Sequence, residues 1–200
     1  MSDRQTANTR QRLVETAADL FYRQGYTATG VAQILREAEV HSGSLYHCFA
    51  SKEELLVAVL ERYRELLWPE VLDPVFGHTD DPIERIFGVL DGYRQMLLLT
   101  GCGGGCPIGN LALELADPSP RVRALLVGNF EGWRQAIEGC VRAAAQSGRL
   151  PDDVDAEALS TFVLTAMEGG IMQARTHRST RPFEASMTML RDYFDRLSAG

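Results

Sequence analysis

The segment from Thr29 to Leu56 constrains the fold of this chain more than any other part of the sequence. A short amphipathic stretch leads through a turn into a second short stretch of small polar residues, and a capping pattern at Ser51 then precedes an apolar run. Two short helices joined by a tight turn form a helix-turn-helix, whose second helix lies in the major groove of DNA. The segment therefore predicts a three-helix, N-terminal unit that binds double-stranded DNA.

The first short helix is expected to be capped by Thr29. Its apolar residues share one face at helical spacing, and these are Val31, Ile34, Leu35 and Ala38. Glu39 occupies the turn that follows. Helix-turn-helix motifs often carry Gly there, so we expect Glu39 to adopt the turn conformation less comfortably than Gly would.

The second short helix is expected to be capped by His41 or Ser42 and anchored by Leu45 and Phe49, which are four residues apart. Gly43 lets the backbone approach a phosphate or a base edge closely. Hydroxyl groups such as that of Tyr46 are common phosphate donors. This helix is therefore the expected reading element.

The segment resembles the TetR (tetracycline-repressor-like) family of bacterial transcription regulators. The matching residues are Thr29, Val31, Ile34, Ala38, Val40, Gly43, Ser44, Leu45, Tyr46, His47, Phe49, Ser51, Lys52 and Glu53. The resemblance implies that phosphates are held by Thr29, Tyr46 and Lys52. It also implies that the residues nearest the bases are Ser42, Gly43, Ser44 and His47.

The charge of the chain is uneven. The net charge is −7, yet residues 1–52 contain six basic and five acidic side chains, so the acidity lies in the remainder. Arg4, Arg10 and Arg12 cluster near the N-terminus, where they are placed to contact phosphate or a minor groove. So few positive charges predict modest non-specific affinity for DNA and a shallow salt dependence.

Several absences narrow the class of protein. No apolar run approaches the roughly 20 residues that a membrane span needs, and the N-terminus has no secretory apolar stretch. The four cysteines are not spaced as a disulfide framework. We therefore expect a cytoplasmic protein without a membrane partner.

Helical periodicity predicts an all-α fold. The resemblance implies about nine helices, with a DNA-binding domain at 1–50 and a ligand-binding and dimerisation domain at 51–200. The first helix is expected to begin at Asn8 or Thr9 and to end at Gly25, and the helix from Ser51 to end near Trp68-Pro69. Residues 73–82 indicate a loop. Further helices are expected at 83–99, 107–116, 119–147, 155–178 and 183–198.

The last two expected helices, 155–178 and 183–198, contain a candidate dimer interface. Phe183, Met187, Leu190, Phe194 and Leu197 repeat at alternating spacings of four and three, which indicates a packing seam. Gly169 and Gly170 on the preceding helix allow a close backbone approach. Both faces could be internal core, but the resemblance implies a homodimer through 155–178 and 183–198, which suits two half-sites of a palindromic operator.

The region between the DNA-binding unit and the last two helices is rich in aromatic residues and methionine. This composition suits a pocket for an apolar or aromatic small-molecule effector, although packing in the core explains each residue singly. The candidate ligand-binding residues are Trp68, Phe87, Tyr93, Met96, Cys106, Asn110, Phe130, Trp133, Met167, Glu168 and Met172.

The glycine-rich segment 100–110 contains Cys102 and Cys106 and has three interpretations. It is a flexible loop, a thiol sensor in which Cys106 precedes a helix N-terminus, or a zinc site. A zinc site would need two ligands besides Cys102 and Cys106, and His78 and His177 are far away in sequence. No Gly-Lys-Ser/Thr follows the glycines, so they do not form a phosphate-binding loop. We expect neither a metal nor a cofactor.

The patterns thus predict a DNA-binding regulator, a repressor released by an effector. A thiol-sensing regulator using Cys106 and Cys102 is the alternative. A cysteine-dependent enzyme is disfavoured because the sequence contains no local Cys-His or Ser-His-Asp pattern. An adaptor that only dimerises is disfavoured because it would not account for Tyr46 and His47 on the expected reading helix.

Overall fold

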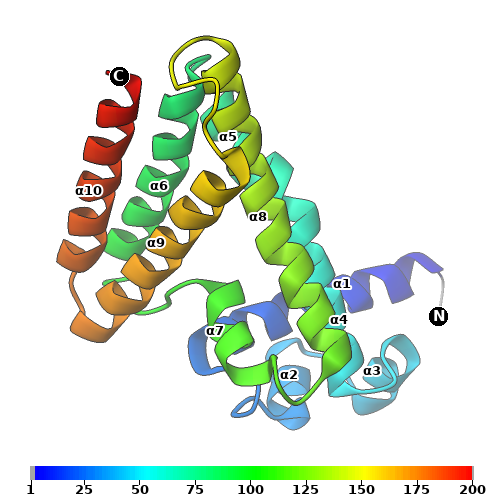
Figure 1. Ribbon diagram of the computed structural model, residues 1–200. Coiled ribbons are helices and arrows are strands. Elements are labelled where there is room, and N and C mark those ends of the chain that lie inside the picture. Colours follow the sequence, from blue (N-terminus) through cyan, green and yellow to red (C-terminus); the bar gives the residue numbers. More distant parts are fainter. Residues whose placement is uncertain (1–2, 200) are drawn as a thin grey trace. The chain divides into compact units, whose positions relative to one another are not determined.

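The computed structural model describes residues 3–199, and all regular elements in this range are helical (Figure 1). The elements are α1 (Asp3–Gln24), α2 (Val31–Glu37), α3 (Ser42–Cys48), α4 (Lys52–Leu66), the π-helix η1 (Leu67–Leu72), α5 (Asp73–Phe76), α6 (Pro82–Leu99), α7 (Pro107–Leu115), α8 (Pro120–Gln146), α9 (Ala156–His177) and α10 (Arg181–Ser198). Because α4, η1 and α5 follow one another without a break, we count them as one helix. The described residues then contain nine helices, which confirms the all-α prediction.

The chain packs into two compact units that are each built from two stretches of sequence. The first unit combines residues 1–65 with 107–129, and the second combines 66–106 with 130–200. These are units of packing, and the functional boundary expected at residue 50 stays a prediction. The helix α8 contributes its first part to one unit and its second part to the other.

The core of the first unit includes one face of α1, the inner faces of α2 and α3, and the apolar run of α4. Its buried residues include Leu13, Ala17, Leu20, Phe21, Ile34, Leu45, Leu55 and Leu56. Gly25 ends α1 with φ of 86°, as its position predicted. The helix begins at Asp3, earlier than the expected Asn8 or Thr9, because the polar residues before Asn8 are compatible with a helix.

The caps of this unit differ in part from the prediction. Ser51 accepts a hydrogen bond from the backbone N–H of Glu54 at 3.1 Å, which confirms this cap. The expected cap at Thr29 is wrong, because Gly30 is the N-cap of α2 and contributes no side chain. His41 is the N-cap of α3, without a capping bond from its side chain.

The helix that begins after Ser51 does not end near Pro69, as expected, but continues to Phe76. A proline inside an α-helix clashes with the carbonyl four residues earlier and donates no hydrogen bond. The chain accommodates Pro69 by widening into the π-helix η1 and then resumes as α5, so the loop expected from residue 73 starts only after Phe76.

The second unit is held by apolar packing of α9 on α10, which lie side by side (Figure 1). A Cβ atom on Gly170 would lie 3.0 Å from the ring of Phe183, so the missing side chain permits this close approach. Asp81 and Asp155 cap α6 and α9 through their carboxylates. None of the helices between residues 3 and 199 has the length and apolar content that a membrane span needs.

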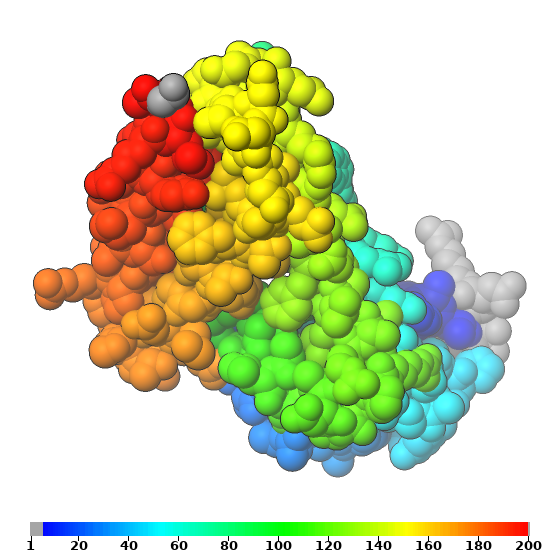
Figure 2. Space-filling view, viewed as in Figure 1, coloured from blue at the N-terminus to red at the C-terminus, as the bar shows by residue number. Residues whose placement is uncertain are grey.

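The predicted seam on α10 faces the interior of its own protomer. Phe183, Leu190 and Phe194 are at most 2% exposed, so the interpretation as internal core is the correct one for them. The exposed apolar side chains of α9 and α10 are instead Phe162, Met172, Met189 and Tyr193. Figure 2 shows the surfaces of these two helices, in orange and red, running beside each other.

Candidate nucleic-acid interface

The helix α3 has one buried and one exposed face. Leu45 is 1% exposed and Phe49, just after the helix, is 5% exposed, so both anchor it as predicted. The predicted base-reading residues Ser42, Gly43 and His47 are exposed, whereas Ser44 is half-buried. These residues, together with Tyr46, lie on one short helix.

Tyr46 is 62% exposed, which is high for an aromatic side chain. A Cβ atom on Gly43 would meet no atom within 4 Å, so the backbone at this position is open to an approaching molecule. The helix contains no lysine or arginine. Its polar face therefore offers hydroxyl and imidazole groups for hydrogen bonds rather than a fixed positive charge.

The turn between α2 and α3 confirms the expectation for Glu39. Its φ is 53°, in the left-handed region that costs an L-residue about 1–2 kcal/mol and costs Gly little. The backbone N–H of Val40 donates to Leu35 at 3.0 Å and closes the turn. The motif thus keeps its geometry at an energetic cost.

Thr29 is fully buried, and its hydroxyl donates to the carbonyl of Gly25 at 2.6 Å. It also accepts a hydrogen bond from the side chain of Gln24 at 3.1 Å. The phosphate contact that the resemblance implied for Thr29 therefore conflicts with its inward orientation. The residue instead fixes the turn between α1 and α2.

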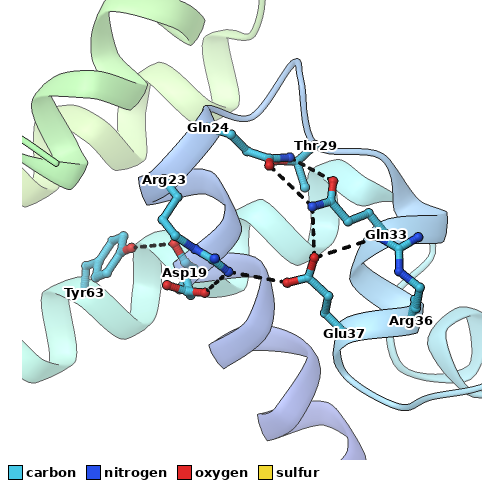
Figure 3. Close-up of polar contacts among 9 residues, drawn as sticks. Asp19, Arg23, Gln24, Thr29, Gln33, Arg36, Glu37 and Tyr63 are labelled. Atoms are coloured by element: carbon cyan, nitrogen blue, oxygen red, sulfur yellow. Dashed lines mark hydrogen bonds and ion pairs between the residues drawn. The ribbon is translucent and has the colours of Figure 1, made fainter. Parts of the chain in front are cut away.

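A polar network on the surface of the first unit joins α1 to α2 (Figure 3). The amide of Gln24 donates to Gln33, whose own amide donates to Glu37 at 3.0 Å. Arg23 then links Glu37 to Asp19. The network orients the first helix of the motif through side chains that remain largely in contact with water.

Lys52 is also turned inward. Its ammonium Nζ donates to the backbone carbonyl of Tyr26 at 2.6 Å and lies 4.0 Å from the centre of the Tyr26 ring. Burial lowers the pKa of Lys52, and the nearby Glu114 carboxylate partly offsets that shift. The predicted phosphate ligand thus has partners inside the protein.

Glu114 of α7 is a residue of this region that the sequence did not reveal. Its carboxylate accepts the backbone N–H of Tyr26 at 2.9 Å and that of Thr27 at 2.5 Å. Burial opposes ionisation, but the bonds from Thr27 and Tyr26 and the charge of Lys52 outweigh it, so the pKa of Glu114 is lowered. No pattern signals a contact between residues 88 positions apart.

The predicted arginines lie on α1. The guanidinium of Arg10 stands over the Phe49 ring, 5.1 Å from its centre, and so lies next to the end of α3. Arg12 is exposed. The side chain of Arg4 lies outside the described residues.

The predicted effector residues separate into groups. Trp133 belongs to a buried cluster against which Tyr93 and Phe76 pack, and the rings of Tyr93 and Trp133 are 5.5 Å apart. Trp68, which is 53% exposed, makes an edge contact with Phe76 at 5.7 Å. Trp68, Tyr93 and Trp133 thus belong to one aromatic region of the second unit.

Cys106 and Glu168 form a second group. The Cys106 thiol donates a hydrogen bond to the Glu168 carboxyl, whose pKa is raised by burial and partly lowered again by that bond. Cys106 and Cys102 are each 4% exposed and are not joined by a disulfide. The carbonyl of Cys102 accepts a hydrogen bond from Arg178 at 3.2 Å, which ties the glycine-rich segment to the end of α9.

The remaining predicted residues are dispersed. Phe87 packs against Phe194 of α10 and lies under the guanidinium of Arg191. Met167 is fully buried, whereas Met172 is 53% exposed. Met96 and Phe130 are half-buried in the second unit, and Asn110 belongs to the first unit.

Comparisons with known proteins agree with this geometry. A family model described as bacterial regulatory proteins, tetR family, matches residues 13–59. A model described as tetracyclin repressor-like, C-terminal domain, matches residues 82–190. The transcriptional repressor DhaR of Mycobacterium sp. (strain GP1) is 29% identical over 181 residues, which are 90% of this chain and 89% of DhaR.

Solved structures are similar over nearly the whole chain. A TetR transcriptional regulator from Chloroflexus aurantiacus is 30% identical with a TM-score of 0.86, and the match covers 96% of each chain. The reduced form of NemR from Escherichia coli is 26% identical with a TM-score of 0.81, covering 92% of this chain and 96% of NemR. The helical fold is therefore shared with proteins that regulate transcription.

Proposed function

As a member of the tetR family of bacterial regulatory proteins, this chain is a DNA-binding transcriptional regulator, and we propose that the exposed face of α3 reads its operator. The observation that carries the proposal is the pairing of buried anchors, Leu45 and Phe49, with an exposed Tyr46 and His47 on the same short helix. The anchors fix the helix, so the exposed side chains are presented to the major groove without extra ordering cost. The protein acts on chromosomal DNA in the cytoplasm.

The proposed contact residues are those that the structure leaves accessible. Ser42, Gly43, Tyr46 and His47 face solvent, and Ser44 is partly accessible. Thr29 and Lys52, whose polar groups are bonded within the protein, are assigned to support instead. Because α3 lacks lysine and arginine, we expect a shallow salt dependence of DNA binding.

The test is selection of genomic DNA fragments by the purified protein at near-physiological salt. Wild-type protein is expected to enrich a palindrome, and Tyr46→Ala to lose it while staying folded. Cys48→Ala, on the same helix, is the matched control that should retain it. Equal enrichment by wild type and Tyr46→Ala would contradict the proposed surface.

The operator is bound by a homodimer formed through α9 and α10. Between these helices lies an open groove of about 700 Å³ bordered by Phe162, Met189 and Tyr193, which are 51%, 63% and 45% exposed. The Phe162 and Tyr193 rings contact each other edge to face at 5.9 Å. Large apolar side chains gathered in this way favour burial against a second copy, and a two-fold dimer is the commonest solution.

The effector binds in the second unit, near the aromatic region of Trp68, Tyr93 and Trp133. An apolar or aromatic molecule suits these rings. The effector changes the affinity of the protein for DNA only if it binds one of two protein conformations more tightly than the other. The chain has two tryptophans, both in this region, so effector binding should change intrinsic fluorescence, and Trp133→Phe should remove most of that change. An unchanged signal would place the effector elsewhere.

Thiol sensing at Cys106 is the second candidate function. The position of Cys106 directly before the N-terminus of α7, and similarity to a regulator solved in a reduced form, support it. Oxidant-induced release of DNA should then be lost in Cys106→Ser and retained in Cys140→Ser. Burial raises the pKa of Cys140 to about 11, so at pH 8 only about one in a thousand of its thiols is ionised. Release that survives in Cys106→Ser would contradict this mode.

A further inference from the structure

The turn between α1 and α2 is held by two opposite charges that come from outside the helix-turn-helix. Glu114 of α7 accepts the N–H groups of Tyr26 and Thr27, and Lys52 of α4 donates to the carbonyl of Tyr26. Gly25 completes the arrangement, because a Cβ atom there would lie 3.1 Å from the Glu114 carboxylate. We name Glu114, Lys52 and the backbone of 25–27 the turn clamp.

The clamp binds polar backbone groups of the turn itself. The N–H groups of Tyr26 and Thr27 and the carbonyl of Tyr26 lie between the end of α1 and the start of α2, and this carbonyl also accepts the N–H of Thr29 at 3.1 Å. Charged side chains are strong partners for such groups, and a carboxylate can accept two neighbouring N–H groups with its two oxygens. The Glu114 carboxylate and the Lys52 ammonium carry opposite charges and bind the same turn, so they also attract each other.

We infer that Glu114 is a positioning residue for DNA binding, which sets the direction in which α2 and α3 leave α1 by clamping this turn together with Lys52. The inference rests on the proposed function, since it concerns how the α3 face meets an operator. Glu114 touches no DNA in this scheme. It acts through the turn, and Lys52 binds the same turn through its hydrogen bond to the Tyr26 carbonyl.

The alternative for Glu114 is a purely stabilising role. In that case its removal lowers the melting temperature, but the folded protein binds DNA as before. A positioning role changes DNA affinity at temperatures where the variant is fully folded, and it changes specific binding more than non-specific binding, because only specific binding depends on register with the bases.

The experiment compares Glu114→Gln and Glu114→Ala with Asp117→Asn, which removes an exposed carboxylate just beyond α7. Hydrogen exchange of the free protein is followed at the amides of Tyr26 and Thr27. Exchange should accelerate about tenfold to a hundredfold in Glu114→Ala, and less in Glu114→Gln, which keeps one acceptor oxygen. Asp117→Asn should exchange as wild type does.

The same variants are then titrated with the DNA that the wild-type protein selects and with unrelated DNA. Affinity for the selected DNA should fall about tenfold in Glu114→Ala, with a smaller change on unrelated DNA. Unchanged exchange, or faster exchange with unchanged affinity, would overturn the inference. If the wild-type protein selects no DNA, the proposed function fails instead, and the exchange measurement still decides whether the clamp exists.

Lys52→Met provides an independent test that does not require altering Glu114. A lysine that neutralises a phosphate contributes about one unit to the slope of log K against log salt for each protomer. If Lys52 belongs to the clamp, Lys52→Met weakens specific binding and leaves this slope unchanged. A slope reduced by about one unit for each protomer would overturn the assignment of Lys52.

Discussion

The turn between α1 and α2 and the pair α9–α10 are held together in different ways. The turn depends on a few polar atoms, chiefly the Glu114 carboxylate and the Lys52 ammonium, which bind backbone groups. The pair depends on buried rings such as Phe183 and Phe194. Polar bonds have directions and fix an orientation, whereas apolar burial supplies most of the stability. Loss of a clamp bond should therefore change mainly the orientation of α2 and α3, and loss of a buried ring mainly the stability of the pair α9–α10.

The largest expected effect is on the apolar side of this comparison. Phe194 is fully buried and contacts Phe87 at 5.5 Å between ring centres. Phe194→Ala should lower the free energy of unfolding by about 3–5 kcal/mol, measured in urea, because it removes a large side chain and leaves a cavity. Asp195→Ala, at the exposed neighbouring position, should stay within about 0.5 kcal/mol. Equal losses of unfolding free energy in both variants would contradict the assignment of Phe194 to the core.

The exposed side of α10 should affect association rather than folding. Tyr193→Glu places a charge in the groove and should weaken dimerisation by at least about tenfold, equivalent to about 1.4 kcal/mol, in analytical ultracentrifugation. Thr176→Glu adds the same charge on an exposed part of α9 that does not border this groove. A dimer that tolerates Tyr193→Glu would have to use another surface.

A backbone change near α3 should stabilise the protein. Glu39→Gly replaces a residue at φ of 53° and should raise the free energy of unfolding by about 1 kcal/mol in the same urea titration. The neighbouring Ala38 has φ of −78°, so Ala38→Gly should instead be destabilising. A loss of stability in Glu39→Gly would mean that the Glu39 side chain makes a contribution larger than the backbone cost.

The smallest effect is expected in the solvated network of Figure 3. The side chains of Arg23 and Asp19 are each 56% exposed. A double-mutant cycle of Arg23→Ala and Asp19→Ala should give a coupling below about 0.5 kcal/mol, decreasing with salt, because water screens exposed ion pairs. A coupling above 1 kcal/mol would place this pair with the clamp rather than with the surface.

Sequence patterns predicted the helices and the exposed face of α3, because periodic apolar residues and capping pairs are local signals. They could not tell which partner an apolar face meets, so Phe183 and Leu190 were assigned to a dimer seam although they face their own protomer. They also missed Glu114 and the inward turn of Lys52, which depend on contacts across 88 and 26 residues. Pro69 was misread because a π-helix leaves no clear signal in sequence.

Each of the two units is assembled from separate stretches of the chain, and this has a consequence for truncation and for recombination between genes. No single cut in the polypeptide divides the units, because residues 107–129 return to the first one. A fragment ending at Glu65 would lack α7 with Glu114, and with it the acceptor for the backbone of Tyr26 and Thr27. A DNA-reading module transplanted from this chain into another regulator must therefore carry α7 and the start of α8 along with it.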